Sequence, residues 1–211
     1  MQALKSGTEN LMRYKIAKTD IIDPKISSPE WESAELGELG FNPWGEYDKA
    51  PKTTFKLLAG PEGLSVLMHT DEKHLRAECL EQNGEVCEDS CMEFFWKPDV
   101  LDPNYLNFEI NPKGVLHLGI GAGRHGRVRI FEDSRIFSIE SMASDGDWTL
   151  KYYIPYSFIY KHFSAVSPVS KANFYKCGDL TLSVHYGVWS KVEVPAPDYH
   201  VPDFFGFLEL D

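Results

Sequence analysis

The feature that most constrains the fold is a series of short segments in which apolar and polar residues alternate. From Thr53 onward this period of two recurs, and turn residues interrupt it at intervals of about 8–12 residues, a spacing typical of all-β domains. No stretch shows a long 3.6-residue period, so the crossover helices that a parallel sheet requires are not expected. The pattern predicts an all-β fold, a two-sheet and mostly antiparallel β-sandwich.

The predicted strands are distributed along most of the chain. They cover Tyr14–Ala17, Thr54–Leu58, Leu64–Thr70, Leu75–Leu80, Cys91–Lys97, Tyr105–Asn111, Val115–Ile120, Arg127–Phe131, Ile136–Met142, Trp148–Ile154, Ala172–Cys177, Leu182–Trp189 and Gly206–Leu210. One short helix is expected at residues 157–163, where Pro155 precedes it and Ser157 can cap it. A length of 211 residues suits one domain. Residues 1–211 are therefore predicted to form a single domain that includes residues 1–52 as a loop-rich lead-in.

The charge balance excludes several classes of partner. The chain carries 21 Lys and Arg against 32 Asp and Glu, a net charge of −11. Nucleic acids and anionic membrane surfaces require a basic field, so neither is an expected partner. No apolar run approaches the roughly 18–20 residues of a membrane span, and residues 1–23 lack the apolar core of a signal peptide. As written, the chain is expected in the cytoplasm with free cysteines, whereas a chain that had lost a leader would be secreted.

The only dense basic segment follows a glycine-rich motif. Residues 121–126 match G-x-G-x-x-G, but a dinucleotide site needs a helix after that motif. Arg127–Phe131 alternates like a strand instead, which favours a hairpin loop. Arg124 in this loop can still bind an acidic small ligand, because a guanidinium makes forked bonds to carboxylates.

Two further patterns offer weaker chemical signals. Glu88 and Asp89 provide oxygen atoms that suit calcium, while the C-x3-C spacing around them differs from the usual zinc C-x2-C. Calcium is therefore one open interpretation, and no metal ligands are assigned. Glu93 and Glu109 lie on neighbouring predicted strands and could serve as the paired carboxylates of a glycoside-active enzyme. The chain has no nucleophile elbow and no catalytic triad motif, so catalysis is not the leading interpretation.

Aromatic residues give a different clue. Most large rings are expected in the core, where they bury a large area. A ring left exposed could stack against the apolar face of a sugar. Tyr199, between Pro197 and Pro202, is the best exposed candidate.

Four segments taken together resemble a known family. They are Glu88–Phe95, Asn107–Gly114, Ala172–Asp179 and Tyr199–Gly206. In this order and spacing they resemble the carbohydrate-binding family 9-like proteins, relatives of the family 9 carbohydrate-binding modules among the DOMON-like sandwiches. The resemblance covers roughly Thr53 to the C-terminus. It implies a two-sheet β-sandwich, a sugar held between two aromatic rings, structural calcium in some members and no catalysis.

The resemblance also implies individual site residues. It places a sugar-contacting carboxylate at Glu93, a stacking ring at Tyr199 and a polar contact at Lys176. The second ring of the family would fall near Cys87, and an arginine of the family would fall at Glu109, where the charge is reversed.

Trp189 or Trp96 is then expected to replace the missing ring, and Arg124 to pair with the sugar if the sugar is acidic. The expected ligand is a mono- or oligosaccharide. Because DOMON-like domains sometimes hold haem, a haem-binding alternative also stays open. Its candidate ligands are Met68, Met92, Met142 and His117.

Overall fold

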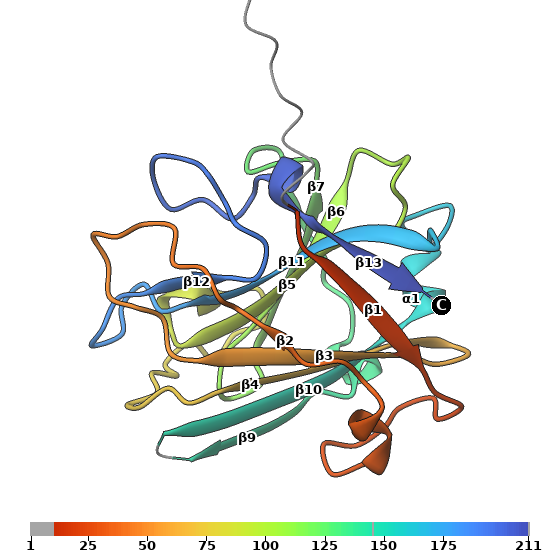
Figure 1. The fold of residues 1–211 in the computed structure, drawn as a ribbon, viewed down its shortest axis with the longest axis horizontal. Coiled ribbons are helices and arrows are strands. Elements are labelled where there is room, and N and C mark those ends of the chain that lie inside the picture. Colours follow the sequence, from red (N-terminus) through yellow and green to blue (C-terminus); the bar gives the residue numbers. More distant parts are fainter. Residues whose placement is uncertain (1–10, 145, 211) are drawn as a thin grey trace, which may run out of the picture.

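The computed structural model describes residues 11–144 and 146–210, and strands dominate this part of the chain (Figure 1). The strands are β1 Arg13–Lys18, β2 Gly37–Glu38, β3 Thr53–Ala59, β4 Gly63–Thr70, β5 Cys91–Lys97, β6 Tyr105–Ile110, β7 Leu116–Gly121, β8 Val128–Arg129, β9 Glu140–Ser144, β10 Asp147–Pro155, β11 Val169–Cys177, β12 Tyr186–Val188 and β13 Gly206–Leu210. The predicted all-β class is confirmed.

Helices contribute little to the described residues. The predicted short helix is confirmed as α1, which spans Tyr156–Ile159 and is shorter than expected. Four 3₁₀ turns accompany it: η1 Pro29–Glu32, η2 Val86–Glu88, η3 Ser134–Phe137 and η4 Pro202–Phe204. Among the described residues, no helix has the length and apolar character needed to cross a membrane.

Strand β1 joins the two halves of the molecule. Its residues Arg13–Ile16 pair in parallel with β13, and Ala17–Lys18 pair in parallel with β3. The hydrogen-bonded path therefore runs without a break in the order β8-β7-β6-β5-β11-β13-β1-β3-β4-β10-β9, with β12 on β11 and β2 on β3. In Figure 1, β3, β4, β10 and β9 form a lower layer, and β1 rises from it towards β13. The observed architecture is thus a curled, mixed sheet, which is consistent with the predicted β-sandwich.

Strand β5 is buried on both faces. Successive side chains of a strand point to opposite sides, so Phe94 and Trp96 enter the main core that lies inside the curled sheet. We call this the inner face. Glu93 and Phe95 lie on the outer face, which a second apolar cluster covers. This cluster includes Trp44, Val188, Val192, Tyr199 and Phe205, from segments before β3 and after β11.

One predicted strand is wrong. Leu75–Leu80 is extended but belongs to no strand, because side chains of the following loop take its backbone N–H groups. Ser90 Oγ accepts from the Arg76 amide at 3.0 Å, and the Asp89 carboxylate accepts from the Glu78 and Cys79 amides at 2.8 and 2.9 Å.

The same hydrogen bonds bear on calcium. Asp89 is buried, and its Oδ2 also accepts from Asn111 Nδ2 at 2.9 Å. Both carboxylate oxygens are therefore used by donors, and the segment does not fit an oxygen-ligand calcium site. Asn111 in turn accepts from the Val115 amide within the turn that ends at Gly114, where φ is +74°.

Candidate functional site

A cleft of about 260 Å³ opens over the outer face of β5, β6 and β11. Its lining is polar at the floor and aromatic at one wall. The lining residues are Cys87, Glu93, Phe95, Glu109, Arg124, Cys177, Asp179, Tyr186, Pro197, Asp198, Tyr199 and His200. Four of the seven predicted site residues, namely Glu93, Glu109, Arg124 and Tyr199, are thus brought together.

Two glutamates lie side by side at the floor of the cleft. Glu93 of β5 is the direct cross-strand partner of Glu109 of β6, and both side chains are buried on the outer face. Burial raises the pKa of each carboxyl, and for Glu93 the neighbouring Glu109 adds to the effect. Two adjacent carboxylates in a poorly solvated site repel each other, which is why the charged form of Glu93 is disfavoured.

Glu109 is held in place by a chain of donors. Asn107 Nδ2 donates to Glu109 Oε1 at 2.7 Å, and the side-chain oxygen Oδ1 of Asn107 accepts from Arg127. The Arg127 guanidinium lies over the ring of Tyr105, 4.4 Å from its centroid. These contacts fix one oxygen of Glu109 and orient the carboxyl towards the cleft.

The glycine-rich loop contributes Arg124 to the rim. The loop joins β7 to β8, so the motif lies in a hairpin as predicted and precedes no helix. Arg124 pairs with Asp198 at 2.9 Å, with side chains 50% and 28% exposed. Its charge is therefore already matched by a carboxylate of the protein.

Tyr199 lines the cleft but is only 8% exposed, so the expectation of a bare ring is wrong. One face of its ring stacks on Tyr175, with centroids 3.9 Å apart and planes 10° apart. Its hydroxyl donates to the Lys176 carbonyl at 3.1 Å. Tyr199 thus supports the cleft wall from behind.

Tyr186, Asp179 and His200 are among the cleft residues that the sequence did not predict. Tyr186 of β12 is partly exposed and lines the cleft. Asp179 lies at the same wall, and burial raises the pKa of its carboxyl. His200 Nδ1 shares a hydrogen bond with the Tyr105 hydroxyl at 2.9 Å, and burial beside arginines lowers its pKa to about 3, so the ring is neutral near pH 7.

The two tryptophans proposed as replacement rings are not available. Trp96 and Trp189 are 1% and 2% exposed and belong to the main core. The Trp96 indole donates to Ser170 Oγ at 3.0 Å inside that core. This corrects the prediction for both residues, because a sealed ring cannot stack on a ligand.

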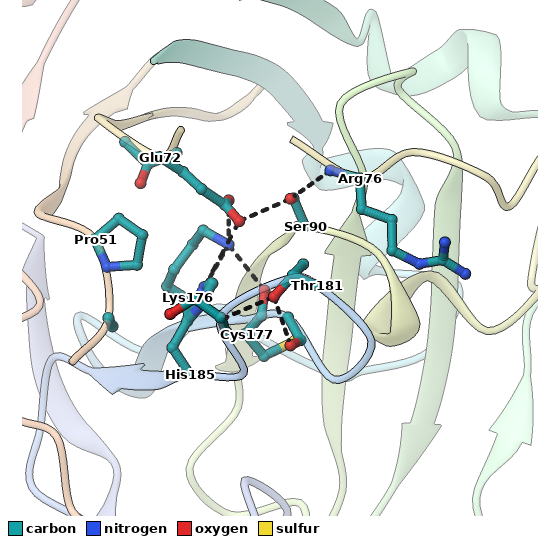
Figure 2. Close-up of polar contacts among 12 residues, drawn as sticks. Pro51, Glu72, Arg76, Ser90, Lys176, Cys177, Thr181 and His185 are labelled. Carbon is teal, nitrogen blue, oxygen red and sulfur yellow. Dashed lines mark hydrogen bonds and ion pairs between the residues drawn. The ribbon is translucent and has the colours of Figure 1, made fainter. Parts of the chain in front are cut away.

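Lys176 points away from the cleft. It alternates with Cys177 on β11, so its side chain lies on the opposite face and is 0% exposed. Figure 2 shows its ammonium directed at Glu72 and His185. The Nζ atom pairs with Glu72 Oε2 at 2.8 Å and donates to His185 Nε2 at 3.1 Å. The predicted polar sugar contact at Lys176 is therefore corrected: this lysine is a buried ion-pair residue.

The haem alternative finds no common pocket among its candidate ligands. Met68 and Met92 are sealed in the main core, while Met142 is exposed on β9. His117 bonds through Nδ1 to the Gly84 carbonyl at 3.0 Å. None of these four side chains lines the cleft.

A curled β-sheet with a polar and aromatic cleft is typical of β-domains that bind small ligands. Comparison with known proteins identifies the family. The model of carbohydrate-binding family 9 matches residues 27–210. The chain belongs to this family, which confirms the resemblance stated from its motifs. A search of curated proteins found no match.

Solved structures agree with this family. The chain is similar to a proposed carbohydrate-binding protein from Bacteroides uniformis ATCC 8492, with 28% identity, a TM-score of 0.80 and coverage of 94% of this chain and 99% of the other. It is also similar to a family 9 module from Caldicellulosiruptor kristjanssonii solved with cellotriose, at 12% identity and TM-score 0.66 over 94% and 93% of the two chains. The glucose complex of such a module gives 14% identity and 0.65 over 95% and 96%.

Proposed function

We propose that this chain binds a neutral saccharide, without cleaving it, in the cleft on the outer face of β5, β6 and β11. Membership of carbohydrate-binding family 9 supports saccharide binding. The modules from Caldicellulosiruptor kristjanssonii, which share the fold, were solved with cellotriose and with glucose. The observation that carries the proposal is that Glu93, Glu109 and Tyr186 line one cleft.

The chemistry of these groups suits a sugar. A pyranose has an apolar C–H face that stacks on a ring, and Tyr186 offers the partly exposed ring. Its hydroxyls need acceptors and donors around the edge, and Glu109, Asp179 and His200 supply them. A cleft of about 260 Å³ is at the small end of ligand sites, which suits one sugar unit with any further units outside.

A neutral sugar fits the charges better than the acidic sugar considered from the sequence. The cleft is lined by the carboxyl groups of Glu93, Glu109, Asp179 and Asp198. Arg124 is paired with Asp198 and so has little charge left for a ligand carboxylate. An added carboxylate would be repelled by the acidic floor.

The glycoside-active enzyme remains the competing proposal, because Glu93 and Glu109 are neighbours on one face. It requires one carboxyl to stay ionised while the other stays protonated. Turnover of aryl glycosides by the wild type, lost in Glu109→Gln, would favour catalysis. Saccharide binding without any turnover would favour the binding function.

The direct test is calorimetric titration with glucose, cellotriose and glucuronic acid. Tyr186→Ala is expected to weaken binding of the neutral sugars by roughly 1–3 kcal/mol, by analogy with base–aromatic stacking. Tyr160→Ala is the matched control, because Tyr160 is exposed beyond α1 and does not line the cleft. Equal affinities for these two variants, or tighter binding of glucuronic acid than of glucose, would contradict the proposal.

A further inference from the structure

Two thiols and a carboxylate converge beneath the cleft. The Sγ atoms of Cys91 and Cys177 and a carboxylate oxygen of Glu93 all lie within 4.8 Å of one another. All three residues are buried, and the cysteines are unbridged. Cys177 Sγ donates to Glu93 Oε1 at 2.9 Å, so two of the three already bond directly.

The strand register accounts for this convergence. Cys91 of β5 is the direct cross-strand partner of Cys177 of β11. Glu93 follows two residues after Cys91 and therefore lies on the same face of β5. Both strands are interior to the sheet, with β6 beyond β5 and β13 beyond β11. The three donor atoms are thus fixed by rigid elements rather than by a mobile loop.

We propose that Cys91, Glu93 and Cys177 form a binding site for a thiophilic divalent cation of the zinc class. Thiolate and carboxylate ligands suit zinc, which accepts two sulfurs and one oxygen in a tetrahedral shell. Ligand atoms separated by less than 4.8 Å can reach one ion with Zn–S distances near 2.3 Å and Zn–O distances near 2.1 Å. Calcium, which prefers six to eight oxygen ligands, does not fit this donor set.

The site is linked to the cleft through shared residues. Glu93 and Cys177 line the cleft, so two of the three proposed ligand residues are shared with it. Binding of the ion replaces two S–H bonds by two S–metal bonds; both thiol protons, together with any proton on the Glu93 carboxyl, leave to solvent. No oxidant is involved, and the proposal stands whether or not the cleft binds sugar.

Cobalt(II) is the probe, because it occupies zinc sites and reports thiolate ligation by absorbance. Titration of the reduced full-length chain is expected to give one equivalent of bound Co²⁺. Thiolate-to-cobalt bands should appear in the near ultraviolet and tetrahedral bands in the visible, and added Zn²⁺ should remove both. Zn²⁺ should also raise the midpoint of thermal unfolding, since an ion that binds only the folded state stabilises it.

Variants identify the ligands. Cys91→Ser and Cys177→Ser are each expected to weaken Co²⁺ binding at least tenfold and to lower the near-ultraviolet band of the bound ion to about half, because one thiolate ligand remains. Glu93→Gln is expected to weaken binding while keeping the full band. Cys79→Ser is the matched control, because Cys79 lies outside the cluster, and it should bind as the wild type does. Thermal unfolding of each variant without metal checks that it folds.

Three results would overturn the proposal. The first is the absence of a near-ultraviolet band in reduced wild-type protein at Co²⁺ excess. The second is equal binding by Cys79→Ser and by a folded Cys177→Ser. The third is a mass two hydrogens lower in the reduced sample, which would show that Cys91 and Cys177 form a disulfide instead. These results test only the cation site. Saccharide binding in the cleft is tested separately, by titrating the metal-free protein with sugar.

Discussion

The two faces of β5 and β11 use the same strands for opposite purposes. On the inner face, Phe94 and Phe174 stack with centroids 4.5 Å apart, and Trp96 continues the row. On the outer face, Glu93 and Cys177 occupy the alternate positions and are just as deeply buried. The inner face follows the ordinary rule that cores are apolar. The outer face retains buried ionisable groups whose pKa values are perturbed, as functional sites commonly do.

The largest expected effect is on the inner face. Trp96→Ala should lower the free energy of unfolding by about 3–5 kcal/mol, because it empties a sealed site and removes the bond to Ser170. Urea unfolding measures this loss. On the outer face, Glu109→Gln should change stability far less, since the amide keeps the volume and can still accept from Asn107. Equal losses of unfolding free energy in the two variants would contradict the difference proposed between the two faces.

Lys176 is the exception on the inner face and gives the next largest effect. Glu72→Gln should cost about 3 kcal/mol, because it leaves the buried Lys176 ammonium without its ionic partner. The double variant Glu72→Gln with Lys176→Met should recover much of that loss, since it removes the buried charge as well. Chemical unfolding of the three proteins tests this. A double variant less stable than Glu72→Gln alone would show that the lysine stabilises by some other contact.

The buried carboxyl of Glu93 on the outer face should make the free energy of unfolding depend on pH. Burial and the neighbouring Glu109 raise the folded-state pKa of Glu93 above its ordinary value of 4.5. The folded state therefore binds the Glu93 proton more tightly than the unfolded state does. The contribution of this proton to the free energy of unfolding is complete below the pKa of Glu93 in the unfolded chain. It is lost as pH rises through the pKa of Glu93 in the folded protein. The difference in unfolding free energy between wild type and Glu93→Gln should fall as pH rises from about 4.5.

Comparison with the variant is needed because buried histidines act in the opposite sense. Burial lowers the pKa of His185 to about 4 and that of His200 to about 3. The contribution of these two histidines to the free energy of unfolding is therefore lost as pH falls below about 6.5. Both proteins share this loss, and the subtraction removes it. A wild-type minus Glu93→Gln difference that stays constant from pH 4.5 to 8 would contradict the raised pKa.

The smallest effect is expected at the rim. The Arg124–Asp198 pair is substantially exposed, and exposed pairs contribute about 0–1 kcal/mol. Arg124→Ala should therefore leave the free energy of unfolding within about 1 kcal/mol of wild type, and should leave the affinity for neutral sugars nearly unchanged. A large loss of affinity for glucose without a loss of stability would show that Arg124 contacts the sugar directly.

Much of the fold follows from local pattern. The period of two located most strands, including the one around Tyr14. The continuity of the sheet did not follow from this period, because β1 pairs with β13 and β3, two strands far apart in the chain. Leu75–Leu80 has a strand-like pattern, yet its amides bond to side chains that no local rule identifies.

The site was less accessible from sequence for a related reason. Alternation separates the two faces of a strand but does not tell which face a distant segment will cover. Trp96 and Trp189 were therefore placed in the site wrongly, and Tyr186 was missed although it lies within a predicted strand. Glu93 and Glu109 were found because adjacent strands bring equivalent positions together.

The most direct test of the account is an NMR titration that maps saccharide binding onto the two faces. With backbone amides assigned, glucose and cellotriose should produce saturable shifts at Glu93, Glu109, Tyr186 and His200. Inner-face amides at Phe94 and Lys176 should shift less. Saturable shifts centred on Thr181–His185 and Glu72, away from the cleft, or no shifts with any sugar at millimolar concentration, would contradict the assignment of the outer face as the binding surface.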